Sequence, residues 1–130
     1  IYASLKLIRI LNNTKKTLNE LTSVYMESSS TPEIKLYCDE KVKFSLLDKI
    51  VKDIPKHYDS GANLNTIDGV RLETENFWFL LRASNTQNCI VFRLEHFVKS
   101  KFKEELIKLI SILESYSLDI KELTTFNQTV

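Results

Sequence analysis

The chain has 130 residues, of which 43% are hydrophobic, so it is long enough to bury the core of one compact domain. Its 18 basic and 17 acidic residues nearly cancel, which excludes the strong positive field that attracts nucleic acid or an anionic membrane. Two cysteines are too few for a disulfide framework, and the sequence contains no long apolar run. The composition therefore predicts a soluble, cytoplasmic domain that recognises any charged ligand through a local site.

The N-terminal part is expected to be helical and to precede the domain. Apolar residues recur there at helical spacing, at Ile1, Leu5, Ile8 and Leu11. Thr17 and Glu20 have the spacing of a capping box, which predicts a second short helix. Residues 28–32 (SSSTP) read as a linker because they are small, hydroxyl-rich and end in proline. We therefore expect residues 1–30 to form a helical segment with a linker and residues 31–130 to form the domain.

The domain is expected to open with a strand and a helix. Polar and apolar residues alternate over residues 33–38, which is the period of a half-buried strand. A helix is predicted next and should end before Pro55, because apolar residues repeat at helical spacing at Leu46, Leu47, Ile50, Val51 and Ile54. Residues 57–66 are rich in polar side chains and are expected to be a connection.

Three strands and a last helix are expected in the second half. The strands are predicted near residues 67–74, 77–82 and 90–95, with Asn76 at the tip of a hairpin. The helix is indicated by apolar spacing at Phe102, Leu106, Leu109, Ile110 and Leu113. The order strand, helix, three strands, helix predicts an α+β fold: a mainly antiparallel four-stranded sheet with two helices on one face, preceded by the N-terminal helical segment.

The run RASNTQN, which begins at Arg82, concentrates hydrogen-bond donors around a turn between two apolar strands. Arg82 can offer paired N–H donors to two oxygens of one phosphate. The side chains of Ser84, Asn85 and Thr86, with backbone N–H groups of the turn, can close around the remaining oxygens, and Gln87 is adjacent. Polar residues are also ordinary turn formers, so the run by itself fits either a phosphate-binding loop or a plain turn.

Three segments together resemble the last domain of the α-D-phosphohexomutases. They are residues 68–73 (DGVRLE), 78–87 (WFLLRASNTQ) and 90–95 (IVFRLE). In that family a strand that begins D-G leads through an apolar strand to a phosphate-binding loop, and the next strand ends in a pattern like R-F-E. The R-A-S-N-T form of the loop is similar to the phosphomannomutase/phosphoglucomutase branch. Asn88 departs from the family, which usually places proline shortly after the threonine, and proline would stiffen the turn.

The resemblance extends upstream, since residues 1–8 are similar to the last helix of the preceding domain and residues 17–21 to the K-x-L-x-E-L segment that follows that helix. It implies that the chain is the C-terminal part of a phosphomannomutase/phosphoglucomutase, an isomerase that interconverts hexose 1-phosphate and hexose 6-phosphate. It also implies that the final domain binds the substrate phosphate through Arg82, Ser84, Asn85, Thr86 and Gln87.

The rest of the family's chemistry is expected outside this chain. A phosphoserine, a Mg²⁺ site and a sugar-binding loop would lie in upstream domains of the same polypeptide, so no catalytic or metal-binding residue is expected here and the isolated chain should be inactive. The expected partners are the hexose phosphate and the upstream domains, with no nucleic acid and no membrane. Two alternatives remain: a free-standing sugar-phosphate-binding or regulatory domain without catalysis, and an interaction module that uses its apolar N-terminal helix.

Overall fold

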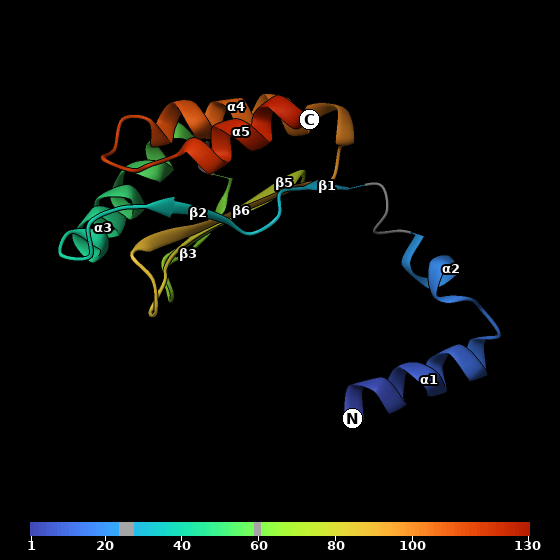
Figure 1. Ribbon diagram of the computed structural model, residues 1–130. Coiled ribbons are helices and arrows are strands. Elements are labelled where there is room, and N and C mark those ends of the chain that lie inside the picture. The colour runs from blue at the N-terminus through green and yellow to red at the C-terminus, as the bar shows by residue number, and fades with distance from the viewer. Residues whose placement is uncertain (24–27, 59–60) are drawn as a thin grey trace.

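The computed structural model describes residues 1–23, 28–58 and 61–130. The helices are α1 (Tyr2–Thr14), α2 (Leu18–Thr22), α3 (Lys43–Asp53), α4 (Phe102–Leu113) and α5 (Lys121–Thr129), with short 3-10 turns at Ile54–His57 and Lys99–Lys101. The strands are β1 (Ser29–Ser30), β2 (Ile34–Tyr37), β3 (Asn63–Asn65), β4 (Val70–Glu73), β5 (Phe77–Ala83) and β6 (Cys89–His96). Helices and sheet are arranged as an α+β domain, and α1 lies apart from it (Figure 1).

Within the described residues, six strands form one antiparallel sheet in the order β1-β6-β5-β4-β3, and β2 also pairs with β6. The expectation of four strands is therefore wrong by two. The additional strands, β1 and β3, are short and polar, and none of their side chains is buried. Backbone pairing with β6 and β4 holds them, and side-chain periodicity does not report such pairing. Residues 57–66 accordingly contain a strand, although residues 59 and 60 of that stretch lie outside the described part.

The predicted linker at residues 28–32 is part of the sheet edge. β1 pairs with the last two residues of β6. Next to it, Thr31 is buried, its N–H donates to the Leu94 carbonyl at 2.8 Å, and its hydroxyl accepts from the Leu94 N–H at 3.0 Å. Pro32 has no N–H to give to the ladder, and β2 resumes the pairing at Ile34. The segment is thus attached to the domain, and residues 24–27 before it lie outside the described residues.

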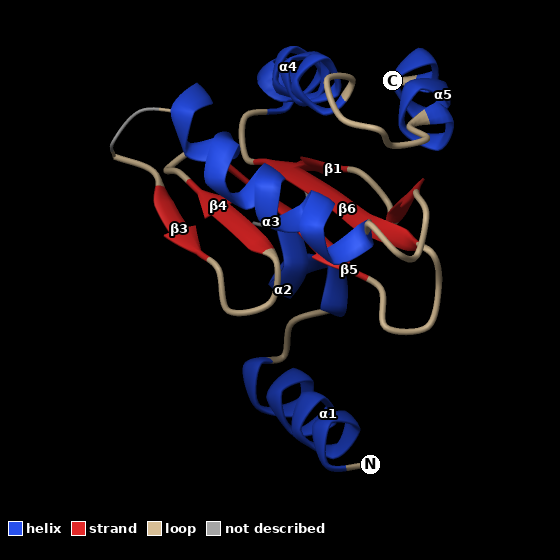
Figure 2. Cartoon of the chain, turned by 90° about the vertical axis from the view of Figure 1, so that its left-hand side faces the viewer, coloured by secondary structure: helices blue, strands red, loops and turns tan. Residues whose placement is uncertain are grey.

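One core joins one face of the sheet to three helices. Alternate residues of β5, namely Phe77, Phe79, Leu81 and Ala83, point into it together with Ile90, Phe92 and Leu94 of β6. The helices contribute Leu47 and Ile50 from α3, Leu106, Leu109 and Leu113 from α4, and Leu123 from α5. Figure 2 shows these helices around the sheet, and in Figure 1 α4 and α5 run side by side above it.

Two helices were expected on one face of the sheet, and the structure has three, α3, α4 and α5. Sequence patterns assigned no structure to residues 116–130, whereas the structure has α5 there, with Leu123 fully buried. Helix α1, by contrast, has no buried residue, and its apolar side chains Tyr2, Leu5 and Ile8 are exposed, as is Ile1 just before it. The N-terminal helical segment is therefore confirmed as helix that makes no contribution to the core of this domain.

His96, the last residue of β6, is a buried imidazole whose neutral form the fold favours. Its side chain lies in the protein interior and stacks against Phe77, with ring centroids 5.6 Å apart. Nδ1 accepts a hydrogen bond from the N–H of Val98 at 3.0 Å. Burial lowers the pKa of His96 below its ordinary value of 6.5, although the nearby carboxylate of Glu105 acts in the opposite direction.

The stability of the chain is expected to depend on pH through His96. The unfolded chain protonates this ring near its ordinary pKa of 6.5 and the folded chain only at lower pH, so the unfolded state binds more protons below pH 6.5. The free energy of unfolding should therefore decrease as pH falls below this value. Urea denaturation between about pH 7.5 and pH 5 measures the effect. His96→Gln should remove this decrease, and His57→Gln, at an exposed position, should retain it. If the free energy of unfolding changed equally with pH in the two variants, the prediction would be wrong.

Candidate functional site

The five residues predicted to bind phosphate come together at the turn between β5 and β6. Arg82 stands between Leu81 and Ala83, which both point into the core, so its side chain lies on the opposite face of the sheet and is 48% exposed. The turn follows directly. Its polar residues are accessible: Ser84 is half-buried, and Asn85, Thr86 and Gln87 are exposed. Their position fits the prediction, and their role in binding stays a prediction.

The turn is closed by its own hydrogen bonds. The N–H of Ser84 donates to the Cys89 carbonyl at 3.0 Å, and the N–H of Cys89 donates to the Gln87 carbonyl at 2.9 Å. The hydroxyl oxygen of Ser84 accepts from the N–H groups of Thr86 and Gln87, at 3.4 and 3.2 Å. The hydroxyl hydrogen of Ser84 can therefore donate to a ligand. Across the described part of the chain, no hydrogen-bond partner is found for the side chains of Asn85, Thr86 and Gln87.

Lys43, which sequence reasoning missed, lies beneath this turn. It is the first residue of α3 and only 1% exposed. Its ammonium donates to the backbone carbonyls of Ser84 at 2.7 Å and Gln87 at 3.0 Å, and to the carboxylate of Glu40 at 2.8 Å. A signal was present in the sequence, because Lys43 stands four residues before Leu47 on the apolar stripe of the predicted helix. A charged residue at such a position is seldom buried unless it is paired.

Asp68 supplies a negative charge beside Arg82. Its carboxylate lies 3.6 Å from the guanidinium nitrogen Nη1 of Arg82, and both side chains are about half exposed or more. Asp68 lies in the turn between β3 and β4. This turn meets the turn between β5 and β6 because β4 and β5 are antiparallel with Val70 opposite Leu81, which puts the start of β4 beside the end of β5. Exposed pairs of this kind add little stability, so the pair leaves Arg82 able to bind an anion.

A cavity of about 270 Å³ adjoins the two turns and α3. Its lining includes Asn85 and Asp68 from the turns and Phe44, Leu47 and Val51 from α3. The helix side of the cavity also carries the carboxylate of Asp48, so polar and apolar groups line it together. Of the five residues predicted to bind phosphate, Asn85 alone lines this cavity.

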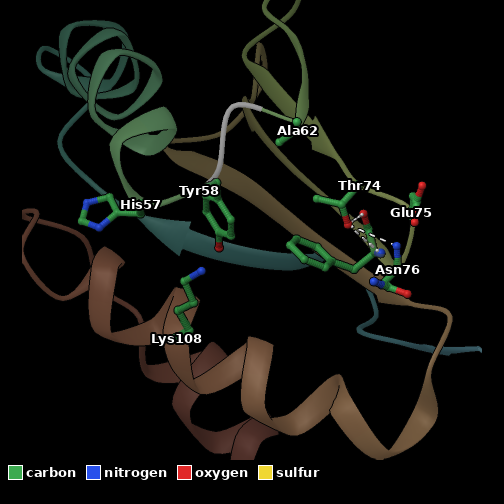
Figure 3. Close-up of a pocket in the computed structure, with 9 residues that line it drawn as sticks. His57, Tyr58, Ala62, Thr74, Glu75, Asn76 and Lys108 are labelled. Carbon is green, nitrogen blue, oxygen red and sulfur yellow. Dashed lines mark hydrogen bonds between the residues drawn. The ribbon is translucent and has the colours of Figure 1, made fainter.

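A larger cavity of about 530 Å³ lies away from the predicted site, between α4 and the turn from β4 to β5. Figure 3 shows Lys108 of α4 pointing toward Tyr58. The ammonium of Lys108 lies 3.8 Å from the ring centre of Tyr58, whose hydroxyl donates to Glu105 at 2.7 Å. Burial and the bond to Glu105 raise the pKa of Tyr58. These polar groups contact one another, and the cavity contains none of the residues predicted to bind phosphate.

Three further features could indicate function: clusters of metal ligands, membrane-spanning helices and reactive cysteines. Among the residues it describes, no three His, Cys, Asp or Glu side chains are grouped so that they could hold a metal ion. Nor does the described part of the chain include a helix with the length and apolarity to span a membrane. Cys89 is buried and Cys38 half-buried, both as free thiols. Burial raises the pKa of Cys38, which disfavours the reactive thiolate.

Several known proteins are similar to this chain in sequence, and a solved structure is also similar in fold. The model of the phosphoglucomutase/phosphomannomutase C-terminal domain matches residues 33–107. A phosphomannomutase/phosphoglucomutase from Pseudomonas putida is 36% identical over 117 residues, which covers 84% of this chain. A probable phosphoglucosamine mutase from Methanobrevibacter smithii is 28% identical over 116 residues, or 85% of this chain. A crystal structure of a phosphoglucomutase/phosphomannomutase family protein from Burkholderia thailandensis matches 71% of this chain with a TM-score of 0.55 and 28% identity.

The match covers only a small part of each relative's own length. This chain spans 24% of the Pseudomonas protein, 25% of the Methanobrevibacter protein and 19% of the Burkholderia chain. The matched residues 33–107 include both turns, Arg82 and Lys43. Because a model of the family's final domain covers more than half of the chain, this chain belongs to the phosphoglucomutase/phosphomannomutase family and contains its C-terminal domain.

Proposed function

We propose that the turn between β5 and β6 holds the phosphate of a hexose phosphate in a mutase that interconverts hexose 1-phosphate and hexose 6-phosphate. One observation carries the proposal: the exposed guanidinium of Arg82 stands next to side chains of Ser84, Asn85, Thr86 and Gln87 that are accessible to a ligand. Relatives named phosphomannomutase/phosphoglucomutase support this class of substrate. Their names also disfavour a free-standing regulatory domain.

In this proposal the turn binds the phosphate that is not being transferred. Arg82 forms a paired hydrogen bond with two phosphate oxygens and balances part of the charge. Hydroxyl and amide groups of Ser84, Asn85 and Thr86 donate to the remaining oxygens. With one end held, the hydroxyl at the other end of the sugar is positioned for phosphoryl transfer from a phosphoserine. Because these donors contact the phosphate and not the ring, the same turn can bind the 1-phosphate or the 6-phosphate.

The reacting groups are proposed to lie elsewhere in the polypeptide. A phosphoserine and Mg²⁺, which supplies charge stabilisation in phosphoryl transfer, would be held by domains upstream of this one. The small share of each relative that this chain spans supports that placement. The 130-residue chain by itself should then show no mutase activity. The free thiols of Cys38 and Cys89 fit a reducing compartment, so we place the enzyme in the cytoplasm.

Arg82→Ala in the full-length enzyme tests the proposed site. The loss of charge-assisted hydrogen bonds should cost about 1.5–3 kcal/mol of substrate binding, or roughly 10- to 150-fold in kcat/KM. Arg82→Lys should restore only part, because an ammonium cannot form the paired contact. Lys101→Ala is the control, since it removes an exposed positive charge near the opposite end of β6. A kcat/KM for Arg82→Ala equal to that of Lys101→Ala would overturn the assignment.

A further inference from the structure

Lys43 is a buried charge with no function in the site proposed above. Of the residues that the structure describes as buried, it is the only Lys, Arg, Asp or Glu. Burial of an ammonium is costly unless its donors are satisfied. A lysine ammonium has three N–H donors, and here the acceptors are the carbonyls of Ser84 and Gln87 and the carboxylate of Glu40.

Packing alone does not require a lysine at this position. An apolar side chain would extend the buried stripe that Leu47 and Ile50 form on α3. Replacement of buried charged groups by apolar residues of similar volume is often neutral or stabilising. The specific effect of Lys43 is instead on the turn between β5 and β6. The single ammonium of Lys43 donates to the backbone carbonyl of Ser84 near the start of the turn and to that of Gln87 near its end.

The direction of these carbonyls determines where the turn presents its backbone donors. In a planar trans peptide, the C=O and N–H point in opposite directions. The carbonyls of Ser84 and Gln87 point toward Lys43, so the N–H groups of Asn85 and Asn88, which belong to the same peptide units, point away from it. Within the described residues these N–H groups have no backbone acceptor. They are therefore available to an anion on the outer side of the turn.

We propose that Lys43 is a positioning residue for phosphate recognition. It holds the turn of residues 84–88 so that the N–H groups of Asn85 and Asn88 face the ligand, and it places a positive charge behind the bound phosphate. Lys43 is 1% exposed, so it acts through the turn and through its field, without contact to the ligand. The proposal rests on the proposed function, since it takes residues 82–88 as the phosphate site.

The test is a titration of the 130-residue chain with inorganic phosphate, followed by backbone amide chemical shifts at constant ionic strength. Lys43→Met removes the charge and the donors at nearly constant volume, and it should weaken binding about tenfold or more. Lys43→Arg keeps the positive charge on a side chain of different length, so its phosphate affinity should lie between those of the wild type and Lys43→Met. Lys41→Met is the matched control, because Lys41 is an exposed lysine in the turn just before α3, and this variant should bind phosphate within about twofold of the wild type.

A second measurement does not depend on phosphate. Without Lys43 the turn loses both carbonyl bonds, so amide hydrogen exchange at Gln87 and Cys89 should become faster, while Phe92 in the centre of β6 stays protected. Wild-type exchange at Gln87 and Cys89 in Lys43→Met would overturn the role in holding the turn. If Lys43→Met does not fold, Lys43→Arg decides, and wild-type binding and exchange in that variant would overturn the proposal.

The two proposals fail in different ways. If the wild type shows no phosphate-dependent shifts at residues 82–88, or if Arg82→Ala binds phosphate as the wild type does, the turn is not the phosphate site and both proposals are wrong. If the wild type binds there and Arg82→Ala does not, but Lys43→Met binds like Lys41→Met, only the role of Lys43 is overturned.

Discussion

Replacing Phe79 with alanine is expected to lower the free energy of unfolding by about 3–5 kcal/mol. Phe79 is fully buried in the centre of β5, where the register places it between Leu72 of β4 and Leu94 of β6. Its ring centre lies 5.6 Å from that of Tyr58. Strands on both sides and helices above confine the space that the ring would leave, so the core cannot collapse into it.

Phe44→Ala is the control for this prediction, because it deletes the same atoms from a side chain that is 56% exposed, and it should cost less than about 1 kcal/mol. Phe79→Leu, which leaves a smaller cavity, should lie between the two. Urea denaturation followed by circular dichroism gives all three values. An equal loss in Phe79→Ala and Phe44→Ala would mean that Phe79 is not at the centre of the core.

The elements that were predictable are those whose residues carry a strong local pattern. Helix α4 follows from apolar residues at helical spacing, and β5 and β6 follow from apolar runs that bound a polar turn. The capping box is confirmed, since the Thr17 N–H donates to the Glu20 carboxylate at 2.7 Å and the Glu20 N–H donates to the Thr17 hydroxyl at 3.3 Å. In each case neighbouring residues alone specify the geometry.

The elements that were missed depend on partners far away in the chain. β1 is a pair of serines and β3 is Asn-Leu-Asn, so neither shows a strand pattern, and both exist because a neighbouring strand offers backbone hydrogen bonds. Helix α5 is buried mainly through Leu123 and packs against α4 and β2. A short helix of this kind is stable only with such packing, which its own sequence does not reveal.

The candidate site divides in the same way. The residues from Arg82 to Gln87 are contiguous, so the concentration of donors was visible in the sequence. Lys43 is 41 residues from Ser84, and Asp68 reaches Arg82 only because β4 pairs with β5. The groups that contact the proposed ligand were thus accessible to sequence reasoning. Their neighbours Lys43 and Asp68 could be found only from the fold.

Gly69→Ala is expected to lower the free energy of unfolding by about 2–5 kcal/mol and to weaken phosphate binding. Gly69 has φ +84°, a conformation that costs an L-residue about 1–2 kcal/mol. An added Cβ would also overlap the carbonyl oxygen of Leu81 and lie 3.0 Å from the Cα of Arg82. Both neighbours are backbone atoms of β5, so relief requires β4 and β5 to separate, at a further cost of about 1–3 kcal/mol.

Gly61→Ala is the control, because a Cβ there would meet no atom within 4 Å. It should change the free energy of unfolding by less than about 1 kcal/mol and leave phosphate binding unchanged. Urea denaturation and the phosphate titration of the same samples measure both effects. Separation of β4 from β5 moves the backbone of Arg82, so Gly69→Ala should alter the chemical shift of Arg82 before any phosphate is added. The prediction would be wrong if Gly69→Ala were as stable as Gly61→Ala and the chemical shift of Arg82 were unchanged. Gly69 would then not be required for the close approach of its backbone to β5.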